Sequence, residues 1–169
     1  FVVLADSDAI YKLDYSKVID FHIKNNADIT MVYHEHETKK SHYYMTFETE
    51  KDGKITEIEI NSAKGGVKKN YINVMVARTS FILRIIQDAI QHGYISFGRD
   101  ILSPGVKTYN LYGYKLEGYY ASITSLSSYF DANMALLDKK VRSEVFGDRD
   151  VYTKVNDSSP AKIAEGAIV

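Results

Sequence analysis

The residues best suited to chemistry in this sequence are Asp6 and Asp8, which follow an apolar run near its start. The run 2–5 has strand length, and helical spacing begins a few residues later, so both aspartates are expected on a strand-to-helix loop. Such loops bind ligands in α/β proteins. Paired carboxylates there suit Mg²⁺ carrying a nucleotide or sugar phosphate, because hard cations take oxygen ligands. Aspartate and serine are also ordinary turn and cap residues, and this second interpretation stays open.

The elements that must position these residues alternate between strands and helices. Residues 15–25 have helical spacing with Asp14 as the N-cap, and residues 27–33 alternate as a strand. The first strand, this helix and the second strand therefore predict a βαβ unit of a parallel sheet. The Asp52-Gly53 pair between two alternating runs predicts a β-hairpin. The fold class is α/β, with helices flanking a sheet.

The remaining pattern adds further elements. Strands are expected over 71–77, 106–116 and 151–155. Helices are expected over 81–91, capped by Thr79 or Ser80 and with its isoleucines in the core, over 97–102, stopped by Pro104, and over 125–146 in two parts.

The histidine pair His34 and His36 would share one face of a strand, a geometry that could bind a metal. No third ligand is evident nearby, and the run continues into Lys39-Lys40. A solvated loop is therefore the expectation here. The other histidines stand alone and are expected at the surface or satisfied in the interior; they are His22, His42 and His92.

The composition excludes several classes of partner. The 169 residues suffice for one domain with a sizeable core, and the formal net charge is −1. Lys and Arg are scattered, so no nucleic acid or membrane partner is expected. No apolar run reaches membrane-spanning length. The absence of cysteine excludes disulfides and fits a cytoplasmic protein.

Several segments resemble the ADP-glucose pyrophosphorylase family. Leu4-Ala5 followed by Ser7-Asp8-Ala9-Ile10-Tyr11-Lys12 is similar to the family's "LAGDHIYK" segment. Residues 97–102 resemble "FGKDLIP", and residues 129–137 resemble "YWxANLDL". Within the family, the wording of residues 118–123 and 151–155 is closest to the GlgD branch, which accompanies the catalytic subunit in glycogen biosynthesis.

The resemblance implies a Rossmann-like, GT-A-like nucleotidyltransferase fold with a mixed sheet, and it implies site residues. Asp8 matches the aspartate that holds the catalytic Mg²⁺. Asn61 stands where the family has a lysine for the phosphate of glucose 1-phosphate, and Ser122 stands at the second aspartate that binds Mg²⁺. A neutral amide and a hydroxyl lack the charge that these roles need. The resemblance thus favours a regulatory or accessory subunit with weak metal, nucleotide and sugar-phosphate binding, whose partner is the catalytic subunit.

Two expectations accompany this hypothesis. The alternative is an active glucose-1-phosphate adenylyltransferase, making ADP-glucose from ATP and glucose 1-phosphate, with Asp6 and Asp100 as substitute residues. The resemblance also implies that residues 1–155 are the C-terminal part of a nucleotidyltransferase domain and that residues 156–169 lead into a left-handed β-helix. An N-terminal nucleotide-binding part with a Gly-rich loop would precede residue 1.

Overall fold

The chain forms two compact units in a computed structural model that describes residues 1–37, 45–61 and 66–147. The first unit comprises Phe1–Asp6 and Asp14–Glu117, and the second comprises Ser7–Leu13 and Gly118–Val169. The strand predicted at 151–155 and the linker at 156–169 lie outside the described residues.

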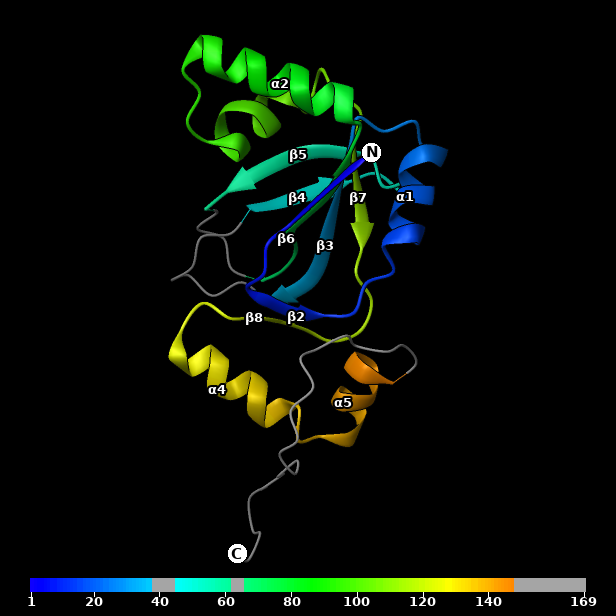
Figure 1. Cartoon of the computed structure of the whole chain (residues 1–169), viewed down its shortest axis with the longest axis vertical. Coiled ribbons are helices and arrows are strands. Elements are labelled where there is room, and N and C mark those ends of the chain that lie inside the picture. The colour runs from blue at the N-terminus through cyan, green and yellow to red at the C-terminus, as the bar shows by residue number, and fades with distance from the viewer. Residues whose placement is uncertain (38–44, 62–65, 148–169) are drawn as a thin grey trace, which may run out of the picture. The chain divides into compact units, whose positions relative to one another are not determined.

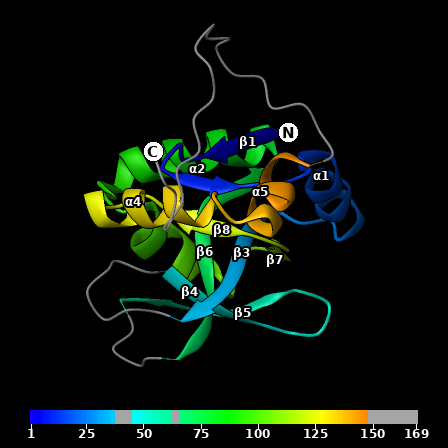
Figure 2. The same ribbon diagram turned by 90° about the horizontal axis from the view of Figure 1, so that it is seen from below.

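A six-stranded sheet forms the centre of the first unit, with the order β5-β4-β6-β3-β7 and with β1 paired to β6. Figure 2 shows β3 and β6 running side by side. Only the β3–β7 pair is parallel among the strand pairs described in this sheet. The strands are β1 (Val2–Ala5), β3 (Ile29–Glu37), β4 (Met45–Thr49), β5 (Ile55–Ile60), β6 (Val67–Ala77) and β7 (Leu111–Lys115).

The predicted βαβ unit is present, but its two strands are not neighbours. Strands β1 and β3 run in the same direction on either side of β6, and both pair with it antiparallel. The sheet is therefore mixed, as the fold class requires, and not the simple parallel sheet that the local pattern indicated. Strand β6 carries a register shift opposite Val32 and Tyr33, next to Asn73 with φ +56°. On its other edge, β6 pairs with β1 over residues 74–77 and with β4 at Asn70.

The predicted hairpin is confirmed. Strands β4 and β5 pair antiparallel, and Gly53 between them has φ +93°. Glycine takes this conformation without the steric strain that a Cβ would bring. The Asp52 carboxylate accepts a hydrogen bond from the Lys54 N–H at 2.9 Å, so the turn residues act as the sequence indicated.

The helices of the first unit differ from their predictions at the ends. Helix α1 (Tyr15–Lys24) has Asp14 as its N-cap, as predicted, whereas α2 (Thr79–His92) begins after Arg78 without a side-chain cap. Thr79 and Ser80 therefore lie inside α2. Gly93 ends α2 with φ +67°.

The helix predicted at 97–102 does not stop before Pro104. It forms a π-helix, η1 (Phe97–Leu102), that leads directly into a short turn, α3 (Ser103–Gly105). Pro104 lies at the start of α3, where its missing N–H needs no intrahelical partner. The next strand is correspondingly shorter than predicted, since β7 begins only at Leu111.

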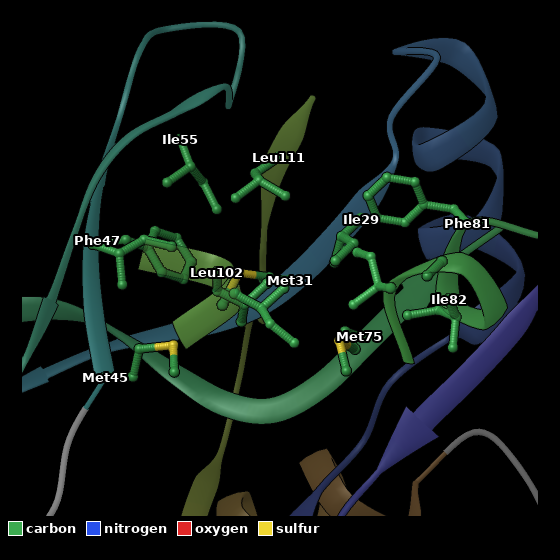
Figure 3. Close-up of a cluster of buried hydrophobic side chains, with 14 of the residues drawn as sticks. Ile29, Met31, Met45, Phe47, Ile55, Met75, Phe81, Ile82, Leu102 and Leu111 are labelled. Atoms are coloured by element: carbon green, nitrogen blue, oxygen red, sulfur yellow. The ribbon is translucent and has the colours of Figure 1, made fainter. Parts of the chain in front are cut away.

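The main core lies between one face of the sheet and the elements α2 and η1 (Figure 3). Alternate β3 residues, Ile29 and Met31, are fully buried there against Phe47 of β4. Helix α2 contributes Phe81, Ile82 and Ile85, while Ile86 is 47% exposed and not part of the core as the sequence suggested. Ile86 directly follows the buried Ile85 on α2, and successive residues of a helix point in different directions, so the Ile86 side chain faces away from the core.

Helix α1 packs against β3, β6 and β7 (Figure 1). Val18 and His22 of α1 are fully buried. Thr30 alternates with the core residues Ile29 and Met31 along β3, so it belongs to the opposite face, and its hydroxyl is 2.9 Å from Nδ1 of His22. Helices therefore cover both faces of the sheet, which is the arrangement predicted from the sequence.

The second unit contains a two-stranded antiparallel sheet of β2 (Ala9–Tyr11) and β8 (Tyr120–Ser122). Two helices follow, α4 (Leu126–Ala135) and α5 (Lys139–Phe146), as predicted. Ser125 caps α4 through a reciprocal pair of hydrogen bonds with Ser128, and Asp138 caps α5. Strand β2 was not predicted, because three residues are too few to show a period.

Acid is expected to weaken the first unit through His22. Burial, and then the Arg78 cation, lower the pKa of His22, and its buried Nε2 has no hydrogen-bond partner among the described residues. The unfolded chain therefore binds this proton more readily, so the free energy of unfolding should decrease as the pH falls below about 6.5.

Urea unfolding of the wild type and His22→Gln between pH 7.5 and 5.5 measures this effect. The variant should lose part of the pH dependence, and a smaller slope should persist because burial also lowers the pKa of His36. The exposed His92→Gln variant is the control and should keep the wild-type slope. Identical slopes for the wild type and His22→Gln would contradict the assignment.

Candidate functional site

The β2–β8 pair brings together the two segments that carry Asp8 and Ser122. Ala9 is the cross-strand partner of Ser122, and the N–H of Ile123 donates to the backbone oxygen of Asp8 at 2.7 Å. Asp8 is exposed and Ser122 is half-buried. Two positions separated by more than a hundred residues thus lie at adjacent points of one small sheet. This is the pairing on which the predicted magnesium site depends.

The donor set at this place does not fit a two-carboxylate magnesium site. Asp8 supplies one carboxylate, whereas Ser122 supplies only a neutral hydroxyl. Across the described residues, no three His, Asp or Glu side chains gather into a possible metal site. We therefore derive no chemical step through Mg²⁺ in this chain.

Asn61 directly follows β5 of the first unit and has a left-handed conformation, with φ +54°. Its side chain is exposed. Asparagine adopts this region more readily than most residues, since its short polar side chain can bond to the local backbone. The residue at the predicted phosphate position therefore has a local structural reason to be asparagine, and it carries no charge for a phosphate.

Asp6 lies at the end of β1, where its N–H donates to the Asn73 backbone oxygen at 3.1 Å. Its carboxylate is exposed. The negative charge adds to burial in raising the pKa of Tyr71, so Tyr71 remains a neutral phenol at physiological pH. Asp6 and Asp8 both lie in the connection 6–8 between β1 and β2, so they share one loop as predicted, but this loop leads to a strand and not directly to a helix. Asp6 belongs to the first unit and Asp8 to the second.

Asp100, the other substitute carboxylate, has a structural role. Its Oδ2 accepts hydrogen bonds from the backbone N–H groups of Ile95 and Ser96, at 2.9 and 2.8 Å. The Ser96 and Ile95 N–H groups hold the pKa of Asp100 below its usual range. These bonds stabilise the loop that leads into η1, and they engage one of the two carboxylate oxygens of Asp100.

A hollow of about 150 Å³ lies beside Asp100 in the first unit. The hydrophobic pattern did not indicate this hollow, because its walls form only when α2 and the η1–α3 region fold next to each other. Helix α2 contributes Ile85 and Asp88, and the other walls come from the loop after α2 and from the η1–α3 region. The lining residues are Ile85, Asp88, Tyr94, Asp100, Ile101, Pro104, Gly105, Thr108 and Tyr109.

The histidine pair is on a strand and not in the solvated loop that we expected. Strand β3 extends to Glu37, and both rings are half-buried on it. Their Nδ1 atoms lie 3.3 Å apart, with ring centroids at 5.5 Å. The strand is longer than predicted because it pairs with β6 along its whole length. His42 lies outside the described residues.

The chain is similar in sequence to several known proteins. No protein-family model matches the chain. Curated relatives called glucose-1-phosphate adenylyltransferase are 28% identical in Lachnospira eligens, over 100% of this chain, and 26% identical in Clostridium acetobutylicum, over 95% of it. The relative of that name in Thermomicrobium roseum is 25% identical over 99% of the chain. All three relatives carry this same name, and the chain is similar to each of them along nearly its whole length.

The glucose-1-phosphate adenylyltransferase resemblance extends along nearly the whole chain, but this chain spans only 40–43% of the length of those relatives. The mixed sheet with helices on both faces is consistent with the Rossmann-like nucleotidyltransferase fold predicted from the sequence. None of the helices in the described ranges is both long and apolar enough to span a membrane.

Proposed function

We propose that the complete protein is a GlgD-type regulatory or accessory subunit of ADP-glucose pyrophosphorylase in glycogen biosynthesis, with little or no catalysis of its own. One observation carries the proposal: the β2–β8 pair sets Ser122, a hydroxyl, beside the segment of Asp8, where the resemblance expects a second carboxylate. Hard cations bind more tightly as ligand charge increases. A site with one carboxylate would hold Mg²⁺ weakly and out of place.

The position of Asn61 supports the same proposal. An exposed amide at the end of β5 offers a phosphate dianion only neutral hydrogen bonds. Charge-assisted hydrogen bonds are roughly twice as strong as neutral ones. We therefore expect weak binding of glucose 1-phosphate, ATP and magnesium at this protein's own site.

A catalytic glucose-1-phosphate adenylyltransferase is the second candidate, and the names of the relatives favour it. It would require substitute carboxylates. Asp100 is a poor substitute, because two backbone N–H groups already bind its Oδ2. Asp6 is exposed and remains available. The two candidates predict different behaviour when the protein is mixed with a catalytic subunit.

Association with a catalytic subunit tests the proposal. Apolar side chains are buried on both faces of the sheet, so the fold should not depend on an intact cleft. A subunit that binds one state of its partner preferentially shifts the partner toward that state. Coupling free energies of this kind typically change affinity about five- to 150-fold.

The complete protein and a catalytic glucose-1-phosphate adenylyltransferase subunit should be co-expressed, purified together and compared with the catalytic subunit alone. We expect a larger complex in light scattering and at least an approximately fivefold change in substrate or effector affinity. The Ser122→Asp variant should associate equally well, since the proposal places association elsewhere. Separate elution with unchanged initial rates would refute the regulatory function.

A further inference from the structure

We infer that His34 and His36 of β3 form a two-histidine binding site for a divalent transition-metal ion of the Zn²⁺ class. The inference rests on the geometry of these rings and is independent of the proposed function. Alternate residues of a strand share a face, so the two imidazoles stand next to each other. Their ring planes are inclined by 31° and their centroids lie 5.5 Å apart.

The Nδ1 atoms of His34 and His36 lie 3.3 Å apart. Two nitrogen ligands at the usual Zn–N distance of about 2.0–2.1 Å, with a tetrahedral angle between them, lie about 3.3–3.4 Å apart. The pair therefore already has the spacing that a metal would impose, and little side-chain rearrangement is needed to bind one.

In the metal-free chain the two Nδ1 atoms are joined by a hydrogen bond of 3.3 Å. One Nδ1 therefore carries a proton and donates it, and the other Nδ1 accepts it. A metal ion would take the place of this proton. The donor ring then moves its proton to Nε2, so both rings stay neutral and both Nδ1 lone pairs point at the metal. Each ring must be neutral to bind a metal through its Nδ1 lone pair.

The surroundings are compatible with a cation. Lys68 is the cross-strand partner of His36, but its Nζ is bound to the Glu59 carboxylate at 2.6 Å, so its charge is balanced. Asn70 is the cross-strand partner of His34, and its Nδ2 donates to the His36 backbone oxygen at 3.0 Å. Its Oδ1 is buried without a hydrogen-bond partner in the described structure. The hydrogen bond from Asn70 Nδ2 holds the backbone of the histidine pair against β6. Water molecules would supply the remaining ligands of the metal.

Titration calorimetry with ZnCl₂ at pH 7.5, on the full chain without an affinity tag, tests the site. We expect one saturable site whose affinity falls at least about tenfold in His34→Asn and in His36→Asn, since even outer-shell substitutions cost 10- to 100-fold. His92→Asn is the matched control, because it removes an exposed histidine from α2 and should leave the affinity unchanged. Binding should also weaken as the pH falls below about 6.5, where imidazoles become protonated.

Nitrogen NMR of the unsubstituted chain gives a test that no variant can obscure. On adding Zn²⁺, the Nδ1 resonances of His34 and His36 should shift together, and both Nε2 atoms should be protonated. Circular dichroism confirms that each variant is folded. Absence of saturable binding, equal affinity in the wild type and both variants, or Nδ1 resonances that do not respond to Zn²⁺ would each overturn the site.

Discussion

The complete protein, assayed alone for ADP-glucose formation with magnesium, is expected to turn over at least about a hundredfold more slowly than a catalytic glucose-1-phosphate adenylyltransferase. Removing a single group that stabilises transition-state charge typically costs 10²–10³ in kcat. Two such positions differ here, at Asn61 and Ser122. Initial rates at saturating ATP and glucose 1-phosphate measure the difference directly.

Restoring the charges sharpens this test. The double variant Asn61→Lys with Ser122→Asp should raise turnover if the remaining cleft is intact, and Ser122→Asp alone should raise Mn²⁺ affinity at least about tenfold, or about 1.4 kcal/mol. Ser125→Asp is the matched control for Ser122→Asp. It adds the same charge three residues away, at the N-cap of α4, where aspartate is well tolerated.

The backbone at Asn61 limits what a lysine can do there. The left-handed conformation, φ +54°, costs a residue with an ordinary side chain roughly 1–2 kcal/mol. Asn61→Gly accepts this backbone without adding charge, so it separates the effect of conformation from that of charge. Turnover of the unmodified protein equal to that of a catalytic subunit would remove the basis for an accessory function.

Replacing Phe47 by alanine is expected to destabilise the first unit by about 3–5 kcal/mol. Phe47 is 2% exposed, and its ring meets the edge of the Tyr33 ring at a centroid distance of 5.4 Å. It also lies over Gly113 of β7, where a Cβ would come within 2.8 Å of the ring. The ring therefore fills the space that the glycine leaves, and its removal creates a cavity bordered by three strands.

Urea unfolding at pH 7.5 measures the loss, with Phe130→Ala as the matched control. Phe130 is 62% exposed on α4, so the same substitution there should change the free energy of unfolding by no more than about 0.5 kcal/mol. The Phe47→Leu variant retains most of the buried volume and should lose less than the alanine variant. A loss below about 1 kcal/mol in Phe47→Ala would show that the core is not packed around this ring.

The candidate site could be predicted only in part. Asp8, Asn61 and Ser122 were found because their flanking segments resemble the family, and the β2–β8 register then placed Asp8 and Ser122 at adjacent points. The separation of Asp6 from Asp8 into different units could not be predicted, because the single residue between the two aspartates does not reveal where one unit ends and the other begins. The hollow beside Asp100 was missed because its walls form only when α2 and the η1–α3 region fold next to each other.

Local chemistry in the sequence determined the turns, caps and periods of this protein. Asp14 caps α1, Gly53 closes the β4–β5 turn, and Gly93 ends α2, each because a short-range hydrogen bond or a positive φ suits that residue type. Tertiary structure decided what depends on distant partners. Strand β6 inserts between β1 and β3, and β3 is extended through the histidine pair by its pairing with β6. The physical reason is that strand pairing joins segments far apart in the chain, and a residue's own neighbours in sequence carry no information about them.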